Sequence, residues 1–337
     1  MIEIRHLTKR YGSHTAVSDL DLTLQPGRIY GFLGPNGAGK STTMNMMTGC
    51  LAPSEGTVII SGHDIIDDTL EAKKCIGYLP EIPPVYPDMT VREYLGFVAS
   101  VRSIHGTERS KDLLRVMELT ETRDAADRLI RHLSKGFRQR VGIAQALIGA
   151  PEFIILDEPT VGLDPAQIIE IRNLIRSLGQ SHTVILSSHI LPEVQACCDH
   201  IMIIDHGKLV ASDSTENLEK LALNENRIVL TVMGEPRIIR ETLLPLSEKA
   251  SVIVGNTSDN SEVPVTIIPG NEEDDLRKDI FFLFASAGLP ILEMGRHHAS
   301  LEEIFLSLTG REFREPSEDG PAGTTGPART DESEASL

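Results

Sequence analysis

The sequence predicts an α/β fold for the first two thirds of the chain, organised around a parallel β-sheet. Residues 153–156 form a continuous apolar run, and residues 183–189 begin with another. Such runs are typical of strands that are buried on both faces of a parallel sheet. Residues 28–33 read as a further short buried strand, which leads through a glycine-rich loop into a helical segment. Strands that alternate with helices in this way predict an α/β domain.

The glycine-rich loop fits the phosphate-binding pattern G-x-x-x-x-G-K-[ST] at every fixed position. Its residues are Gly34, Pro35, Asn36, Gly37, Ala38, Gly39, Lys40, Ser41 and Thr42. Backbone N–H groups can wrap a polyphosphate only where the chain turns sharply, which glycine tolerates best. Lys40 would place a positive charge beside the outer phosphates, and the Ser41 hydroxyl is placed to ligate Mg²⁺. The alternative is a chance turn, but the flanking strand and helix favour a nucleoside triphosphate site.

Short strands are predicted on both sides of this loop. Residues 2–5 and 16–24 show near-alternate apolar side chains, and residues 56–62 are β-branched and bounded by glycines. Tyr11 lies between the first two strands, where it could be a core aromatic or a platform on which a base stacks. With a phosphate-binding loop downstream, stacking is the preferred interpretation.

An α-helical insertion is predicted at residues 90–126, with a break at Gly106. Thr90 and Glu93 form a capping-box pattern at its start. Ser134 then reads as the N-cap of another helix, whose free N–H groups would attract an anion. Considered alone, Ser134 is better explained by an ordinary capped helix.

Two acidic residues follow the buried strand at residues 153–156. Asp157 and Glu158 would lie at the C-terminal edge of the parallel sheet, where α/β proteins bind ligands. Asp157 is placed for Mg²⁺, and Glu158 for polarising an attacking water. His189 ends the strand at residues 183–189, so we expect it at the same edge and in a functional role. A purely structural pair of acids is disfavoured, because an unpaired buried charge is costly.

Composition excludes several classes of protein. The chain of 337 residues carries a formal net charge of −17, which argues against binding the backbone of a nucleic acid. No apolar run approaches the length that spans a bilayer, and the N-terminus lacks the pattern of a signal peptide. The adjacent His297 and His298 would point to opposite faces of a strand, so we expect no metal there. The cysteines are predicted to be small buried apolar residues in a reduced cytoplasm: Cys50, Cys75, Cys197 and Cys198.

Taken in order, these segments resemble the ATP-binding subunit of an ABC transporter over residues 1–220. The motifs that carry the resemblance are the adenine-stacking Tyr11, a Walker A loop at 34–41, a Q-loop at 78–81, a signature at 133–137, a Walker B strand ending in Asp157 and Glu158, a D-loop at 162–164 and the switch residue His189. Lys135 and Phe137 depart from the usual Leu-Ser-Gly-Gly-Gln signature, and Glu81 replaces a glutamine. The Tyr-Leu-Pro-Glu sequence and the signature lysine are similar to the ABC-2-type exporter branch, which includes drug-resistance-like and gliding-motility-like ATPases.

The resemblance implies a P-loop NTPase fold of the ABC cassette type and a mechanism shared between two subunits. Ser134 and Gly136 of one subunit would face the nucleotide on the Walker A loop of the other. Glu158 would act as general base, His189 would hold the γ-phosphate, and Asp164 would link the two sites. ATP would close the head-to-tail dimer, and hydrolysis would reopen it.

The resemblance also implies the ligands and the partners. ATP and Mg²⁺ are the expected cofactors, with Ser41, Asp157 and Glu81 as the residues near the metal. The expected partners are a separate membrane permease, which would dock near residues 82–94, and a second ATPase subunit in a homodimer or a mixed pair. This implies a cytoplasmic protein that is peripheral on the inner face of the cell membrane.

Two other functions were compatible with a phosphate-binding loop. Soluble ABC ATPases that act in translation usually carry two cassettes, and those that act in DNA repair insert a long coiled coil before the signature. Here about 94 residues separate Lys40 from Ser134, and one cassette is present. A catalytically silent regulatory subunit is disfavoured because Glu158 and His189 are both present.

Residues 227–310 are predicted to form a small C-terminal accessory domain of the α+β class. The expected order of elements is βαββαβ, which suggests a ferredoxin-like fold, with an amphipathic helix at 272–287. A capping box at 300–303 predicts a short closing helix that reaches residue 308. Residues 311–337 are rich in Pro, Gly, Ser, Thr and acids, and are predicted to be a disordered tail.

Overall fold

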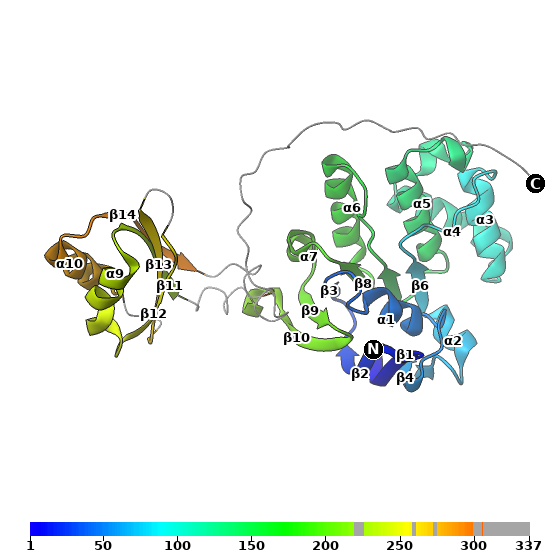
Figure 1. The fold of residues 1–337 in the computed structure, drawn as a ribbon. Coiled ribbons are helices and arrows are strands. Elements are labelled where there is room, and N and C mark those ends of the chain that lie inside the picture. Colours follow the sequence, from blue (N-terminus) through cyan, green and yellow to red (C-terminus); the bar gives the residue numbers. More distant parts are fainter. Residues whose placement is uncertain (219–225, 258–260, 272–274, 299–304, 306–337) are drawn as a thin grey trace, which may run out of the picture.

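The computed structural model describes residues 1–218, 226–257, 261–271, 275–298 and 305 (Figure 1). Within these residues the chain forms three β-sheets, two before residue 218 and one after residue 226. The predicted tail at 311–337 lies outside the described residues, as does all of the predicted closing helix at 300–308 except Phe305.

The N-terminal strands form an antiparallel sheet in the order β2-β1-β4-β5. Its strands are β1 (Ile2–Tyr11), β2 (His14–Leu24), β4 (Glu55–Ile60) and β5 (His63–Asp64). β1 is longer than the predicted strand at residues 2–5, because irregularities in its register let it stay paired with β2 beyond Ile4. Tyr11 therefore lies at the end of β1, at the turn into β2.

The central sheet has the order β10-β9-β3-β8-β7-β6. The five strands from β9 to β6 in this order run parallel to one another. β9 and β10 form an antiparallel hairpin. The strands are β3 (Ile29–Leu33), β6 (Ile76–Leu79), β7 (Phe153–Leu156), β8 (Thr183–Ser188), β9 (His200–Asp205) and β10 (Lys208–Ser214). Because β3, β7 and β8 are parallel, their carboxyl ends meet at one edge of the sheet.

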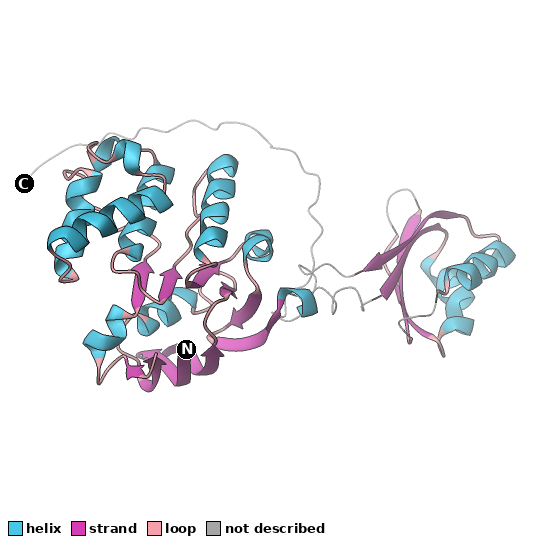
Figure 2. Cartoon of the chain, turned by 180° about the vertical axis from the view of Figure 1, so that it is seen from behind, coloured by secondary structure: helices cyan, strands magenta, loops and turns pink. Residues whose placement is uncertain are grey.

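The helices of residues 91–197 cover one face of the central sheet, whereas the antiparallel sheet and the two helices of residues 40–74 lie on the other (Figures 1 and 2). The helices are α1 (Lys40–Met47), α2 (Thr69–Lys74), α3 (Val91–Val101), α4 (Gly106–Leu119), α5 (Lys135–Leu147), α6 (Pro165–Leu178) and α7 (Leu191–Cys197), with short 3₁₀ turns η1 (Arg123–Ala125) and η2 (Ile130–His132). The predicted insertion is present as α3 and α4. Its capping box is confirmed, since the Thr90 hydroxyl accepts the Glu93 N–H and the Glu93 carboxylate accepts the Thr90 N–H.

The β7 sequence has no alternation of polar and apolar residues because both faces of the strand are covered. Phe153 and Ile155 belong to a hydrophobic cluster shared with the antiparallel sheet and α1, whereas Ile154 and Leu156 belong to a second cluster under the helices. The four side chains are fully buried. The prediction of a strand covered on both faces is confirmed.

The C-terminal residues form an antiparallel sheet with the order β12-β13-β11-β14. Its elements are β11 (Asn226–Met233), α9 (Pro236–Leu243), η3 (Leu244–Leu246), β12 (Ala250–Val254), β13 (Glu262–Pro269), α10 (Arg277–Ala287) and β14 (Ile291–His298). The βαββαβ order and this strand order are those of a ferredoxin-like fold. α10 differs from the amphipathic prediction: Ile280 and Phe284 are buried, but Phe281 and Phe282 are more than half exposed.

The prediction for the cysteines is right for only two of the four. Cys197 and Cys198 are buried, whereas Cys50 is exposed and Cys75 is partly exposed. Cys50 lies just after α1 in the turn into the next strand, where the main chain reaches the surface.

Among the described residues, no helix combines the length and apolar character that crossing a bilayer requires.

Candidate nucleotide-binding site

The phosphate-binding loop joins β3 to α1 in a conformation that requires glycine. Gly37 and Gly39 have φ values of +81° and +103°, in the left-handed region that side chains rarely adopt. At Gly34 the constraint is space, because a Cβ atom there would lie 2.3 Å from the carbonyl oxygen of Ile204. The loop therefore turns tightly and packs directly against β9.

Lys40 is buried at the first position of α1, with its ammonium group at the loop. Its Nζ donates hydrogen bonds to the carbonyl oxygens of Gly34, at 2.8 Å, and Pro35, at 3.3 Å. The same nitrogen lies 3.3 Å from Glu158 Oε1. A buried ammonium needs such partners, and here they hold the charge where the loop would meet a phosphate.

Asp157 lies just beyond β7 and is almost fully buried. Its Oδ1 accepts hydrogen bonds from the Ser41 hydroxyl at 3.1 Å and from the Ser187 hydroxyl at 2.6 Å. Burial raises the pKa of this carboxyl above its usual value, although the two hydroxyl groups oppose the shift. Ser41 and Asp157 thus place two hard oxygen donors side by side, which is the ligand chemistry that Mg²⁺ prefers.

Glu158 and His189 meet at the same edge of the sheet. His189 Nδ1 lies 2.9 Å from Glu158 Oε2, and the backbone N–H of Glu158 donates to the Ser187 hydroxyl at 2.8 Å. Glu158 has a φ of +47°, an uncommon value for a non-glycine residue. The turn after β7 therefore points the carboxylate toward Lys40 and His189, and strained backbone of this kind is often found at functional sites.

One cavity of about 520 Å³ brings most of the predicted nucleotide-site residues together. It is lined by Tyr11, His14, Ala16, Asn36, Gly37, Gly39, Lys40, Ser41, Thr42, Glu81, Glu158, Val161 and His189. Gly34, Pro35 and Ala38 belong to the loop but do not line the cavity, and the predicted metal ligand Asp157 does not line it either. Tyr11 is 49% exposed, and Lys9 Nζ lies over its ring, 5.4 Å from the centroid. The interpretation of Tyr11 as a core aromatic is therefore wrong. An exposed ring beside a phosphate-binding loop fits the stacking interpretation.

Ser134, Gly136 and Asp164 lie outside this cavity, at the starts of two neighbouring helices. Ser134 caps α5 by accepting the Phe137 N–H, and Asp164 caps α6 by accepting the Gln167 N–H. Gly136 lies against α6, because a Cβ atom there would come within 2.8 Å of the Gln167 side chain. The two helix starts therefore contact each other, and Ser134, Gly136 and Asp164 do not line the cavity at the phosphate-binding loop of their own chain.

A second cavity of about 260 Å³ lies between the predicted Q-loop and the signature helix. Its lining is Glu81, Ile82, Pro83, Val85, Lys135, Arg138, Gln139 and Val161. Glu81 lines both cavities, so it lies between the nucleotide site and the start of α5. Ile82 is 81% exposed, which leaves an apolar side chain at the entrance.

Comparison with known proteins agrees with this arrangement. A family model described as "ABC transporter" matches residues 17–161. The chain is 31% identical over 326 residues to the Nod factor export ATP-binding protein I of Cupriavidus metallidurans, with 94% of this chain and 99% of the relative covered. It is 35% identical to the bacitracin transport ATP-binding protein BcrA of Bacillus licheniformis, with 92% and 97% covered.

The chain belongs to the ABC transporter family. It is an ATP-binding subunit that hydrolyses ATP. Among solved structures, the ATP-binding subunit of an ABC transporter has a TM-score of 0.59 at 26% identity and covers 66% of this chain and 92% of its own. A dimeric cassette bound to ADP and Pi has a TM-score of 0.58 at 26% identity, with 64% and 99% covered. The prediction of an ABC ATPase cassette is confirmed.

Several residues of this ABC cassette were not found by sequence reasoning. Ser187 joins Asp157 to the backbone of Glu158, and its place in the strand next to β7 could have indicated this contact. The buried carboxylate of Glu193 accepts hydrogen bonds from the hydroxyl groups of Thr160, at 2.5 Å, and Ser188, at 3.2 Å. Glu193 lies on a helix with no motif of its own, so only the tertiary structure shows that it joins the segments that follow β7 and β8.

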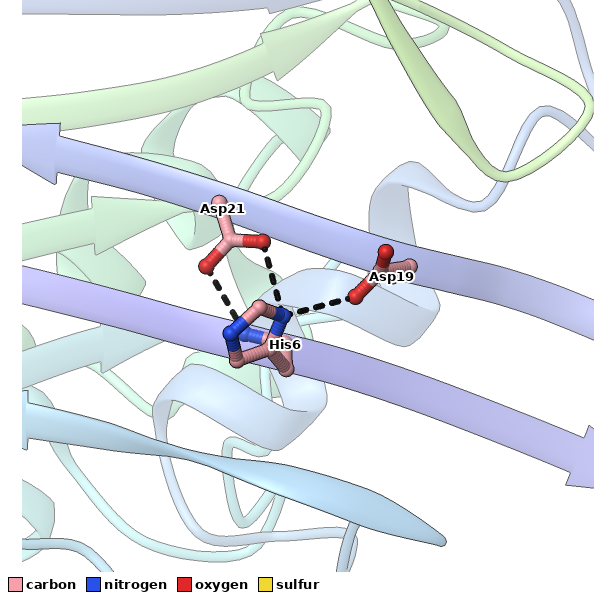
Figure 3. A group of neighbouring side chains, drawn as sticks. All are labelled: His6, Asp19 and Asp21. Atoms are coloured by element: carbon pink, nitrogen blue, oxygen red, sulfur yellow. Dashed lines mark hydrogen bonds and ion pairs between the residues drawn. The ribbon is translucent and has the colours of Figure 1, made fainter.

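A cluster of possible metal ligands lies elsewhere on the cassette surface, on β1 and β2 (Figure 3). His6 Nδ1 lies 2.9 Å from Asp19 Oδ1 and 3.2 Å from Asp21 Oδ2. The hydrogen bond with Asp19 and the charges of both carboxylates raise the pKa of His6. All three side chains are more than half exposed and already bind one another, so we assign no metal to them.

Proposed function

We propose that this chain is the ATPase subunit of an ABC-2-type exporter, in which it pairs head to tail with a second ATPase subunit and drives a separate permease. Relatives are named for Nod factor export, bacitracin transport and linearmycin resistance, and the first of these names supports the export direction. The match with each extends over nearly the whole length of both chains, so the likeness includes the C-terminal region.

One observation carries the proposal for a shared site. Tyr11, the phosphate-binding loop, Glu158 and His189 line one cavity, whereas the start of α5 does not line it. The free N–H groups at a helix start bind anions well, and α5 begins on the surface with Ser134 exposed. A second subunit that supplies its own nucleotide would give this helix start its anion.

In the proposed mechanism each residue acts where its contacts hold it. Lys40 would bind the outer phosphates, Glu158 would take a proton from the attacking water, and His189 would orient Glu158 and bind the γ-phosphate. Ser41, Asp157 and Glu81, which also lines the cavity, are the residues that would hold Mg²⁺. The metal would neutralise charge that develops on the phosphate oxygens.

The helical insertion offers a surface for the permease. Ile82, Tyr86 and Phe97 expose apolar area there, and the rings of Tyr86 and Phe97 are 5.5 Å apart. Exposed apolar side chains that gather in this way commonly mark a protein interface. We place the chain on the cytoplasmic face of the membrane through this contact, with residues 1–220 as the cassette and residues 227–310 as an accessory domain.

The proposal is tested by ATPase turnover measured against protein concentration for the wild type and for Glu158→Gln. We expect turnover to rise more steeply than linearly with concentration, because each site needs two subunits. Glu158→Gln should lose about 10²–10⁴-fold in turnover, the usual contribution of a general base. ATP should then convert this variant into a stable dimer, visible by light scattering. Linear turnover together with a variant that stays monomeric in ATP would contradict a site shared by two copies.

A further inference from the structure

Two adjacent thiols lie at the end of α7, outside the nucleotide site. Cys197 Sγ and Cys198 Sγ are 3.9 Å apart, and neither residue is more than 7% exposed. Both line a cavity of about 350 Å³, together with Arg176, Gln180 and Asp199 among others. The cavity gives a small reagent a route to thiols that the rest of the fold covers.

The geometry of the pair disfavours a direct disulfide. A disulfide needs its sulfur atoms about 2.0 Å apart and its Cα atoms usually at least about 4.4 Å apart. Adjacent residues on a trans peptide have Cα atoms only about 3.8 Å apart. A single atom that bonds to both sulfurs would remove this conflict, because the sulfurs can stay close to their present separation.

The electrostatics of the pair suit a reaction that begins at one thiol. The hydrogen bond with Cys198 lowers the pKa of the Cys197 thiol, helped by the charges of Arg176 and Arg172 and opposed by burial. Burial raises the pKa of Cys198. A thiolate is the reactive form of cysteine, so Cys197 would react first and Cys198 would close the ring.

We propose that Cys197 and Cys198 form a chelating dithiol site for a trivalent arsenical, with both sulfurs bonded to one arsenic atom. Thiolates are soft ligands that bind soft, thiophilic atoms. With an arsine oxide, two S–H bonds and the As–O bond break and two As–S bonds form. The oxygen leaves as water with both protons, and arsenic stays trivalent, so no oxidant or reductant is needed.

The site is connected to the catalytic segments through α7. The Cys197 thiol donates a hydrogen bond to the backbone oxygen of Glu193 at 3.0 Å. The Glu193 carboxylate in turn accepts from Thr160 and Ser188, which lie beside Glu158 and His189 in sequence. Loss of the Cys197 donor and strain at the helix end would loosen these contacts, so an arsenical should slow ATP hydrolysis.

The test uses the full chain carrying Cys50→Ser and Cys75→Ser, with phenylarsine oxide as the probe and intact mass as the readout. We expect one phenylarsenic group per chain, with the loss of two hydrogens, mapped to the peptide that contains both thiols. The adduct should survive an excess of β-mercaptoethanol and be removed by dimercaptopropanol, because only a dithiol competes with a chelate. ATPase turnover should fall with the adduct and return with its removal.

Single variants separate chelation from ordinary thiol chemistry. Cys197→Ser and Cys198→Ala should each lose the adduct that resists β-mercaptoethanol, while thermal unfolding reports whether the fold is kept. Cys198 lies against Gly31 of β3, so Cys197→Ser serves as the variant less prone to disturb packing. A resistant adduct that persists in either single variant, or none in the parent protein, would overturn the proposal. Neither result depends on the dimer or the permease.

Discussion

At the scale of the residue, Asp157 shows how the site exchanges stability for function. Its carboxyl is buried at the end of β7, and burial shifts its pKa upward. The raised pKa means that the folded state disfavours the charged form of this carboxyl relative to the unfolded chain. Ser41 and Ser187 reduce the cost without removing it. A buried carboxylate at this cost is expected where a cation must bind.

Replacement of Asp157 by asparagine should therefore leave the apo protein at least as stable as the wild type at pH 7. The amide oxygen can still accept from Ser41 and Ser187, and no charge is buried. Mg²⁺-dependent turnover should fall by at least about tenfold, because the anionic metal ligand is lost. Thermal unfolding in EDTA and ATPase assays with graded Mg²⁺ measure the two effects.

The pH dependence of this comparison has a definite sign. The folded pKa of Asp157 lies above its unfolded value, so the cost of its charge is present at neutral pH. This cost should shrink as the pH falls through the folded pKa, because the folded state then takes up a proton before the unfolded state does, and it vanishes below the unfolded pKa, where both states are protonated. Asp157→Ala is the matched control, since it leaves the buried Ser187 hydroxyl and the partly buried Ser41 hydroxyl without this acceptor and should cost about 1–3 kcal/mol. An asparagine variant that is less stable than the wild type at pH 7 would contradict the argument.

At the scale of the element, α3 and α5 begin with equivalent caps in different surroundings. Thr90 caps α3 in the helical insertion, and Ser134 caps α5 at the predicted signature. Each hydroxyl accepts the N–H of the residue three positions later. Cap energetics alone therefore do not distinguish the two helix starts.

The variants Thr90→Ala and Ser134→Ala should each lower stability by about 1 kcal/mol, the usual effect of losing an N-cap. Only Ser134→Ala should also reduce ATPase turnover at saturating ATP, because the proposed dimer places Ser134 against the γ-phosphate of the partner subunit. Denaturant unfolding and steady-state kinetics separate the two effects. Equal turnover in both variants would mean that Ser134 is an ordinary cap.

At the scale of the whole molecule, the C-terminal region has its own core, and its described residue Phe305 contacts the cassette. A separate hydrophobic cluster lies between its sheet and α9 and α10. Phe305, which follows β14 in sequence, instead packs against the cluster under the cassette helices. Phe305 therefore adds a residue from beyond β14 to the hydrophobic packing of the cassette.

Phe305→Ala should lower the stability of the cassette by about 1–3 kcal/mol, less than the loss of a fully buried phenylalanine, because Phe305 is only partly buried. Phe282→Ala is the matched control, since this ring is 56% exposed and its loss should change stability by less than about 0.5 kcal/mol. Thermal unfolding followed by circular dichroism measures both. A Phe305 variant as stable as the control would show that the contact does not hold the two regions together.

The sequence by itself determined the elements whose patterns are local. The loop at 34–42 needs glycine for its backbone angles, and β7 needs apolar side chains toward both faces. Thr90 and Ser134 cap their helices by accepting a hydrogen bond from the N–H of the residue three positions later. Each of these depends on neighbours in sequence, so the residues alone predict it. The βαββαβ order of the C-terminal region was predicted for the same reason.

The tertiary structure decided which of these pieces meet. It brings Tyr11, Lys40, Glu158 and His189 to one cavity and leaves Ser134 outside it, because parallel strands gather their carboxyl ends at one edge while α5 begins elsewhere. It also buries two of the four cysteines as an adjacent pair. The contacts that form the cavity join residues far apart in the chain. Their energies depend on burial and charge, which no local pattern encodes.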